Sequence, residues 1–113
     1  MKIHHILKAA EFKDILHKGK KIHGKTVSFY VSPEENSQPL SVGVIISKKQ
    51  AALAVRRNHI KRLIYAHFRG LGEIALRGRK VIVRLVENVN EQSAREVSLK
   101  VREELRALTG KVR

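Results

Sequence analysis

Side chains suited to phosphate binding are concentrated near the middle of the chain. From Lys48 to Val86 there are 11 Lys or Arg residues and one acid, Glu73, a balance of +10 in a chain whose net charge is +14. Charge that served only solubility would be spread over the whole chain. Charge gathered in one region produces a strong local positive field, which favours a polyanion as the partner.

The spacing within residues 54–69 predicts a helix that displays this charge on one side. Its apolar stripe would consist of Val55, Ile60, Leu63, Ile64 and Phe68. The opposite side would carry Arg57, Asn58, Lys61, Arg62, Tyr65 and Arg69. Arginine grips phosphate with a planar fork, and an asparagine can bond both 2′-hydroxyls and the RNA backbone. An ordinary solvated face usually alternates in sign, but residues 56–69 contain no acid, so we interpret this face, with Arg56, as RNA-binding.

A protein active site is not evident in the sequence. A two-metal nuclease needs several carboxylates around ions about 3.5–4 Å apart, whereas Glu11, Asp14, Glu73 and Glu87 are isolated from one another. The six histidines show no metal-ligand spacing, and surface or RNA-facing roles are favoured over metal binding or acid–base chemistry. We therefore expect no catalytic residue and no metal ligand in this chain.

The surrounding elements must position the basic helix. Apolar spacing predicts a first helix over 9–17 that stops at Gly19, followed by a basic connection over 18–25. Alternation predicts strands over 26–32 and 40–47 that form an antiparallel pair, with Tyr30 on an accessible face opposite Val27, Phe29 and Val31. An acidic, proline-bounded loop at 33–39 would lie away from RNA. Residues 73–76 are a candidate short helical turn. Residues 80–86 read as an inner strand, parallel to 40–47 through a helical crossover. A last helix would start near Asn90, or at Ser93 by capping-box spacing with Glu96, and end at Gly110.

At 113 residues, these elements predict one α+β domain, an α/β sandwich in the order α-β-β-(β)-α-β-α over residues 1–113. The absence of cysteine excludes disulfides and fits a reducing compartment. Residues 1–8 are too polar for a signal peptide, and no apolar run approaches the roughly 20 residues of a membrane helix. We expect a cytoplasmic protein that does not bind membranes, with no obligate protein partner evident.

The central segment resembles the signature of the protein subunit of bacterial ribonuclease P. The family pattern is approximately S-K-K-x-G-x-A-V-x-R-N-x-x-K-R. The residues that match it are Ser47, Lys48, Lys49, Ala54, Val55, Arg57, Asn58, Lys61 and Arg62. Three features depart from the pattern: a linker before Ala54 that is one residue longer and lacks the glycine, His59 in place of a second arginine, and Tyr65 at a position that is often basic.

The resemblance covers nearly all of the chain, and in the N-terminal third it implies a second RNA-contacting region. Residues 12–19 resemble the first helix of the family, and residues 26–30 its first strand. The family uses the positions of Phe12 and Tyr30 in a cleft that holds the single-stranded leader of precursor tRNA, and Leu16 stands where an aromatic is frequent. Lys48 and Lys49 are assigned by the same resemblance to the leader or its junction. An ordinary core role for Phe12 remains an alternative from its spacing alone.

The resemblance also implies the activity and the partners. It implies a ribonucleoprotein that removes the 5′ leader from precursor tRNA, with the catalytic centre and the Mg²⁺ ions on the RNA subunit, and a left-handed crossover around the basic helix. The catalytic RNA would be bound by Arg56, Arg57, Asn58, Lys61, Arg62 and Arg69. The alternatives are a small ribosomal protein or general RNA chaperone, and a self-sufficient nuclease that uses histidines and carboxylates.

Overall fold

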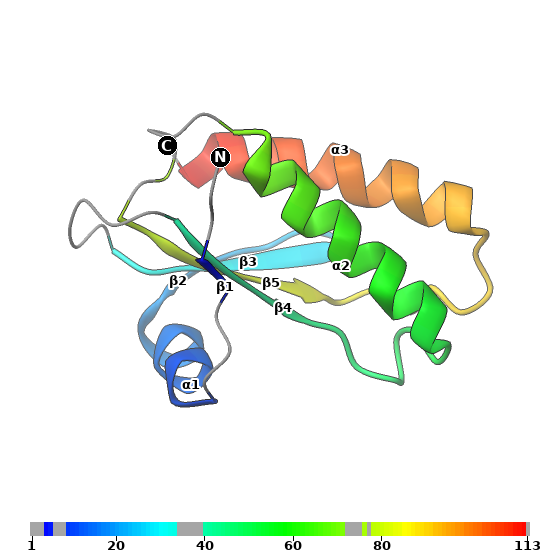
Figure 1. The fold of residues 1–113 in the computed structure, drawn as a ribbon, viewed down its shortest axis with the longest axis horizontal. Helices are drawn as coiled ribbons and strands as arrows, with labels where there is room; N and C mark the ends of the chain where they lie inside the picture. The colour runs from blue at the N-terminus through cyan, green and yellow to red at the C-terminus, as the bar shows by residue number, and fades with distance from the viewer. Residues whose placement is uncertain (1–3, 6–8, 34–39, 72–75, 77, 113) are drawn as a thin grey trace.

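The computed structural model describes residues 4–5, 9–33, 40–71, 76 and 78–112. Along the chain the elements are β1 (His4–His5), α1 (Ala9–Lys18), β2 (Lys20–Ile22), β3 (Val27–Val31), β4 (Ser41–Ile45), α2 (Ala54–Arg69), β5 (Lys80–Leu85) and α3 (Ala94–Val112). One sheet has the strand order β1-β4-β5-β3-β2. Helices α2 and α3 lie on one face of this sheet and α1 lies on the other (Figure 1). The expected mixed α+β sandwich is confirmed.

The central strand is β5, and its position overturns one predicted pairing. We expected residues 26–32 and 40–47 to pair with each other, but β5 lies between them, antiparallel to β3 and parallel to β4. The reason is that β5 has apolar residues on both faces, with Val81, Ile82 and Val83 all buried, and such a strand gains most from an inner position. The predicted parallel β4-α2-β5 crossover is confirmed, and its left hand stays a prediction.

Alternation along the strands produces two separate cores. The larger core lies under α2 and α3 and contains Phe29, Val42 and Val83 together with Ile60, Phe68 and the inward residues of α3. The smaller core, on the α1 side, contains Ile15, Tyr30 and Ile82, with Phe12, Leu16 and Ile45 packed against it. Apolar side chains therefore pack on both faces of the sheet, and α1 is held by a small core of its own.

The ends of the helices follow local sequence rules in most places. Gly19 ends α1, where its amide donates to Ile15 O at 2.7 Å and a Cβ atom would lie 2.5 Å from the same oxygen. Ser93 caps α3 through a hydrogen bond from Glu96 N to its Oγ at 3.1 Å, so the later of the two predicted starts is confirmed. The predicted stop at Gly110 is wrong, because α3 continues to Val112.

Two elements were not predicted, and two predicted segments lie outside the described residues. β2 lies within the predicted basic connection and carries no alternating pattern, because Lys20 and Lys21 precede a single apolar residue, and β1 has only two residues. The acidic loop falls on 34–39, and most of the expected turn at 73–76 falls on 72–75, which the structure does not describe. In the described part of that turn, Leu76 is buried and has a positive φ of 57°.

A carboxylate on α3 fixes the start of β3. Glu104 Oε1 accepts hydrogen bonds from the amides of both Thr26 and Val27 at 2.8 Å. A second carboxylate, Glu87, accepts from Thr26 Oγ1 at 2.9 Å and forms an ion pair with Lys100 at 3.3 Å. Burial alone would raise the pKa of Glu87, but hydrogen bonds from Gln92, Thr26 and Lys100 hold that pKa below its usual value. These contacts join α3 to the sheet at the end where β5 finishes.

Candidate nucleic-acid interface

The exposed face of α2 carries four of the predicted RNA-binding residues. Asn58, Lys61, Arg62 and Arg69 are all exposed, while Ile60, Ile64 and Phe68 are fully buried against the sheet and α3. The first turn of α2 contains no acid, and its N-cap residue, Leu53, makes no side-chain capping bond. The positive end of the helix dipole is therefore uncompensated next to the exposed Lys48 and Lys49.

Three residues of α2 do not lie where the spacing predicted: Val55, Arg57 and Tyr65. Tyr65 was expected on the outward side, but it is half-buried and packs against the larger core. Val55 was expected in the apolar stripe but is 73% exposed, because the buried face is centred on Ile60 and Ile64 and Val55 lies on the far side of the helix. Arg57 was expected opposite the stripe but is half-buried, and its Nη1 donates to the carbonyls of Ala51 and Ala52 at 2.8 Å. Arg56 is also half-buried, and its Nη1 donates to Gln92 O at 2.7 Å.

The linker that lacks a glycine is held by the loop after β5. Asn90 accepts from the amide of Ala52 at 2.8 Å and donates to Lys49 O at 2.9 Å. The amide of Val89 donates to Gln50 O at 2.9 Å. These bonds add a tertiary contact to the local turn, in which Ala51 N donates to Ser47 O at 3.1 Å. Together they fix the backbone of Lys49 relative to the start of α2.

The histidine at the second arginine position of the motif packs against a neighbouring helix. His59 Nε2 lies 2.8 Å from Ser98 Oγ of α3. The Ser98 hydroxyl donates its own proton to Ala94 O, so His59 Nε2 must be the protonated nitrogen in this pair. About two turns further along α2, His67 Nε2 lies 2.9 Å from Thr109 Oγ1, whose hydroxyl donates to Leu105 O. Burial, and then the nearby charge of Arg106, lower the pKa of His67. Through their contacts with Ser98 and Thr109, both histidines help to hold α2 against α3.

A second predicted region is a shallow groove of about 480 Å³ between α1 and β4. We call it the α1–β4 groove; its lining residues are Ala9, Phe12, Lys13, Val44, Ile45, Ile46 and Lys61. Phe12 is half-buried at this groove, and the structure brings it to the same surface as Lys61 of the basic helix. Apolar walls with cations at the rim suit a flexible single strand, whose bases stack while its phosphates meet the cations.

Tyr30 lies on the predicted face of the sheet, but the expectation of an exposed ring is wrong. Only 8% of the residue is exposed, because the ring is packed with Ile15 and Ile82 under α1. Burial would raise the pKa of its hydroxyl, but hydrogen bonds from Lys21 and Arg84 lower it below its usual value. Tyr30 thus supports α1 and is not available for base stacking in this structure. Leu16 is half-buried in the same small core.

Two basic residues near the groove were missed from the sequence. Lys13 lines the α1–β4 groove. Arg84 is exposed on β5, pairs in register with Ile45, and lies close enough to Tyr30 to bond its hydroxyl. A charged residue inside an otherwise apolar strand was the available signal for Arg84, since its alternate position places it on the α1 side.

Within the described part of the chain, no group of three or more His, Asp or Glu residues could hold a metal ion. Among the same residues, no helix is long and apolar enough to cross a membrane. The lining of the α1–β4 groove includes no carboxylate. The residues that the structure gathers here can bind an anionic chain, but they do not form a recognisable hydrolytic centre.

A small α+β domain with an acid-free basic helix beside an apolar, lysine-rimmed groove belongs to the class of proteins that bind polyanions. The family profile described as Ribonuclease P matches residues 1–111. The chain therefore belongs to the ribonuclease P protein family, which implies an RNA partner in a ribonucleoprotein.

Individual relatives agree with this assignment. The chain is 28% identical over 87 residues to the ribonuclease P protein component of Pseudanabaena sp., an alignment that covers 77% of this chain and 75% of that one. It is 36% identical over 67 residues to the component from Halalkalibacterium halodurans, covering 59% and 56%. The Staphylococcus aureus RNase P protein has a similar fold, with a TM-score of 0.75, 23% identity, and coverage of 95% and 96%. The Thermotoga maritima RNase P protein, in complex with a thiourea compound, has a TM-score of 0.67 and 20% identity, and the match covers 84% of this chain and 91% of that chain.

Proposed function

We propose that this protein, as the protein component of ribonuclease P, binds the catalytic RNA through α2 and the 5′ leader of precursor tRNA in the α1–β4 groove. The observation that carries the proposal is the shared surface of Phe12 and Lys61, since it makes the groove continuous with the basic helix. An RNA chain could then pass from one to the other without leaving a cationic surface. A ribosomal or general chaperone role is not favoured, because the family match spans residues 1–111.

Cleavage itself is assigned to the RNA subunit in this proposal. It is supported by the scattered acids of the sequence and by the lack of a three-residue ligand cluster among the described residues. Mg²⁺ would bind to the RNA and substrate phosphates, which suit its preference for oxygen ligands and retained waters. Cations such as Lys48, Lys49 and Arg62 would then assist metal binding indirectly, by reducing repulsion between phosphates. The expected site of action is the cytoplasm.

Leader binding predicts a selective effect of Phe12→Leu. Leucine keeps most of the apolar packing against Ile15 but removes the aromatic face, so affinity for leader-bearing precursor tRNA should fall by about 1–2 kcal/mol. Affinity for mature tRNA should not change. The measurement is equilibrium binding of both RNAs by the reconstituted holoenzyme, at one salt concentration.

The matched control is Tyr30→Phe, which keeps a buried ring and removes only the hydroxyl. It should leave the difference between precursor and mature tRNA within about 0.5 kcal/mol, because the ring stays packed under α1 and Tyr30 is not among the lining residues of the groove. An equal loss for both RNAs in Phe12→Leu would show that Phe12 supports the fold or the RNA subunit contact, and the leader assignment would be abandoned.

A further inference from the structure

A second cationic site lies at the end of the sheet where β2 and β5 begin. It is a pocket of about 370 Å³ with Lys18, Lys20, Arg79 and Lys111 around it and Ile22 and Val31 in its lining. The four cations come from four parts of the chain: the end of α1, the start of β2, the residue before β5 and the last turn of α3. We call it the β2–α3 pocket. The volume is within the range of small-molecule sites, so it admits a nucleotide-sized group.

The pocket is partly preorganised by bonds to Ser32. Arg79 is half-buried, and its Nη1 donates to Ser32 O at 3.2 Å. The backbone amide of Lys80 donates to Ser32 Oγ at 2.8 Å, and that of Ser32 donates to Lys80 O at 2.9 Å. The guanidinium is thus fixed on a rigid strand end, whereas Lys20 and Lys111 are exposed and free to adjust. A fixed fork with flexible ammonium groups around it is an arrangement suited to phosphate.

The charges around the pocket are unbalanced. No carboxylate is among the described residues that line it, and Glu34 and Glu35, which follow Pro33 in the chain, lie outside the described part. Among the described residues, the only ion pair of these four cations joins Lys18 to Asp14 at 3.2 Å. Their side chains are 73% and 62% exposed, and an exposed pair of this kind contributes little to stability. Four like charges around one hollow repel each other, and a bound anion relieves that repulsion.

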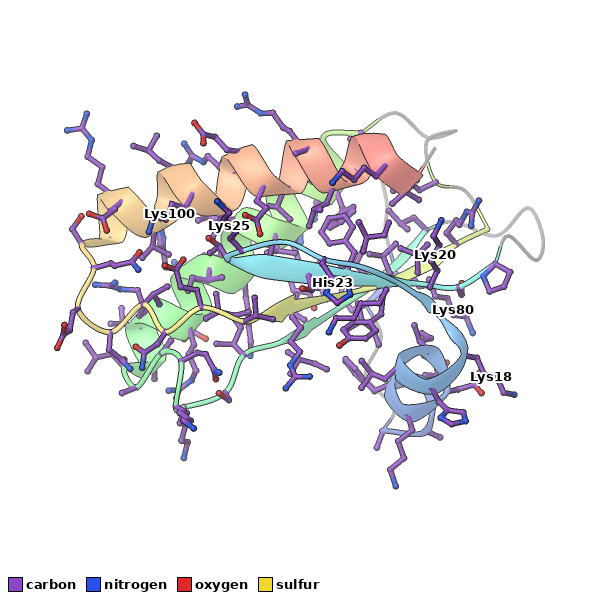
Figure 2. The ribbon with its side chains drawn as sticks, turned by 180° about the vertical axis from the view of Figure 1, so that it is seen from behind. Lys18, Lys20, His23, Lys25, Lys80 and Lys100 are labelled. Atoms are coloured by element: carbon purple, nitrogen blue, oxygen red, sulfur yellow. The ribbon has the colours of Figure 1, made fainter. Side chains whose placement is uncertain are left out.

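The pocket is separate from both regions of the proposed interface. In the sheet, Ser41 pairs with Lys80 at the pocket end, whereas Ile45, which leads to Lys48 and Lys49, pairs with Arg84 at the other end. Figure 2 shows Lys18, Lys20 and Lys80 together at one end of the molecule and Lys25 and Lys100 toward the other. The linings of the β2–α3 pocket and the α1–β4 groove have no residue in common.

We propose that the β2–α3 pocket is a further RNA contact, which binds the phosphate backbone of an RNA chain with a sugar or base over Ile22 and Val31. This inference rests on the proposed function, because it assigns a second anchoring point to the same ribonucleoprotein. An RNA chain is favoured over a small anion because Lys18, Lys20 and Lys111 continue the cationic surface outside the hollow and are all exposed. Two contacts at opposite ends of the sheet would also fix the orientation of the protein on its RNA.

The test is lysine acetylation footprinting of the protein in its reconstituted holoenzyme, read out by mass spectrometry. Lys61 reports the proposed interface, Lys20 and Lys111 report the pocket, and the exposed Lys25 serves as a reference outside both. We expect Lys61, Lys20 and Lys111 to be protected and Lys25 to react as in the free protein. Protection of Lys61 alone would overturn the pocket inference and leave the proposed function standing. Protection of the pocket lysines without Lys61 would contradict the proposed interface instead.

A pair of variants tests how much the β2–α3 pocket contributes to RNA affinity. Lys20→Gln with Lys111→Gln should lower the slope of log affinity against log salt for the RNA subunit by about one to two, as expected for two lost phosphate contacts. The matched control, Arg95→Gln with Arg102→Gln, removes two exposed charges from α3 outside the pocket and should change the slope by less than half as much. Equal changes in both variants would refute a localised contact.

In the acetylation experiment, protection of Lys20 and Lys111 by AMP alone would assign the pocket to a free nucleotide and also overturn the proposal.

Discussion

Replacing Lys61, Arg62 and Arg69 of α2 by glutamine is expected to weaken binding to the RNA subunit about 100-fold near 0.15 M salt. Each phosphate contact is worth about fivefold at that concentration from counterion release, and three contacts multiply. The salt slope should fall by roughly three units. Folding should be unaffected, because all three side chains are exposed and the buried face of the helix is formed by Ile60, Ile64 and Phe68.

The control for this variant removes three exposed charges elsewhere, by Lys25→Gln, Arg95→Gln and Arg102→Gln. It should lower the affinity much less, since these residues lie outside both proposed RNA regions. Arg57 is deliberately left out of the test variant. Its bonds to Ala51 O and Ala52 O mean that its loss would affect the start of α2 as well as any RNA contact. Equal losses in the test and control variants would mean that total charge, and not the face of α2, governs binding.

Glu104→Ala is expected to lower the free energy of unfolding by about 2–4 kcal/mol. The substitution removes the carboxylate that accepts hydrogen bonds from the amides of Thr26 and Val27. Both residues are almost fully buried, so their amides would lose this acceptor in a site with little access to water. Hydrogen bonds to a charged group are stronger than neutral ones, and an unsatisfied buried donor costs its full desolvation energy. Urea denaturation monitored by circular dichroism measures the loss.

The adjacent Glu103 provides the matched control. Glu103 is exposed, so Glu103→Ala should change stability by no more than about 0.5 kcal/mol. Glu104→Gln keeps a carbonyl oxygen as acceptor and should have an intermediate effect. If Glu104→Ala and Glu103→Ala were equally mild, the bond between α3 and the start of β3 would not be a determinant of stability.

Local patterns predicted the helices well because helix signals are local. Each signal acts within a few residues of the chain. The structure confirms the cap of α3 by Ser93, the apolar repeat along α3 and the end of α1 at Gly19. The phase of α2 was less well predicted. Val55 extends the apolar repeat in the sequence, yet it is exposed. The positions of α3 and the sheet decide which side of α2 is buried, and the apolar repeat alone carries no information about those positions.

Strand pairing and the state of individual site residues depend on distant parts of the chain. Whether β3 meets β4 or β5 is decided by the order of strands in the sheet, which no single strand specifies. Alternation correctly placed Tyr30 opposite Phe29, but it could not show that α1 covers the ring. Likewise the types of Arg56 and Arg57 suggested phosphate contacts, while their bonds to backbone carbonyls arise from the loop after β5 and the linker before α2.

Cleavage of precursor tRNA at low Mg²⁺ by a ribonuclease P RNA, with and without this protein, tests the proposed function most directly. We expect RNA and protein together to release the leader under conditions where the RNA alone does so poorly, and the RNA-free protein to release none. Cleavage by the protein alone, surviving nuclease decontamination, would contradict the assignment of catalysis to the RNA. The absence of any stimulation by the folded protein would contradict its proposed role in leader removal.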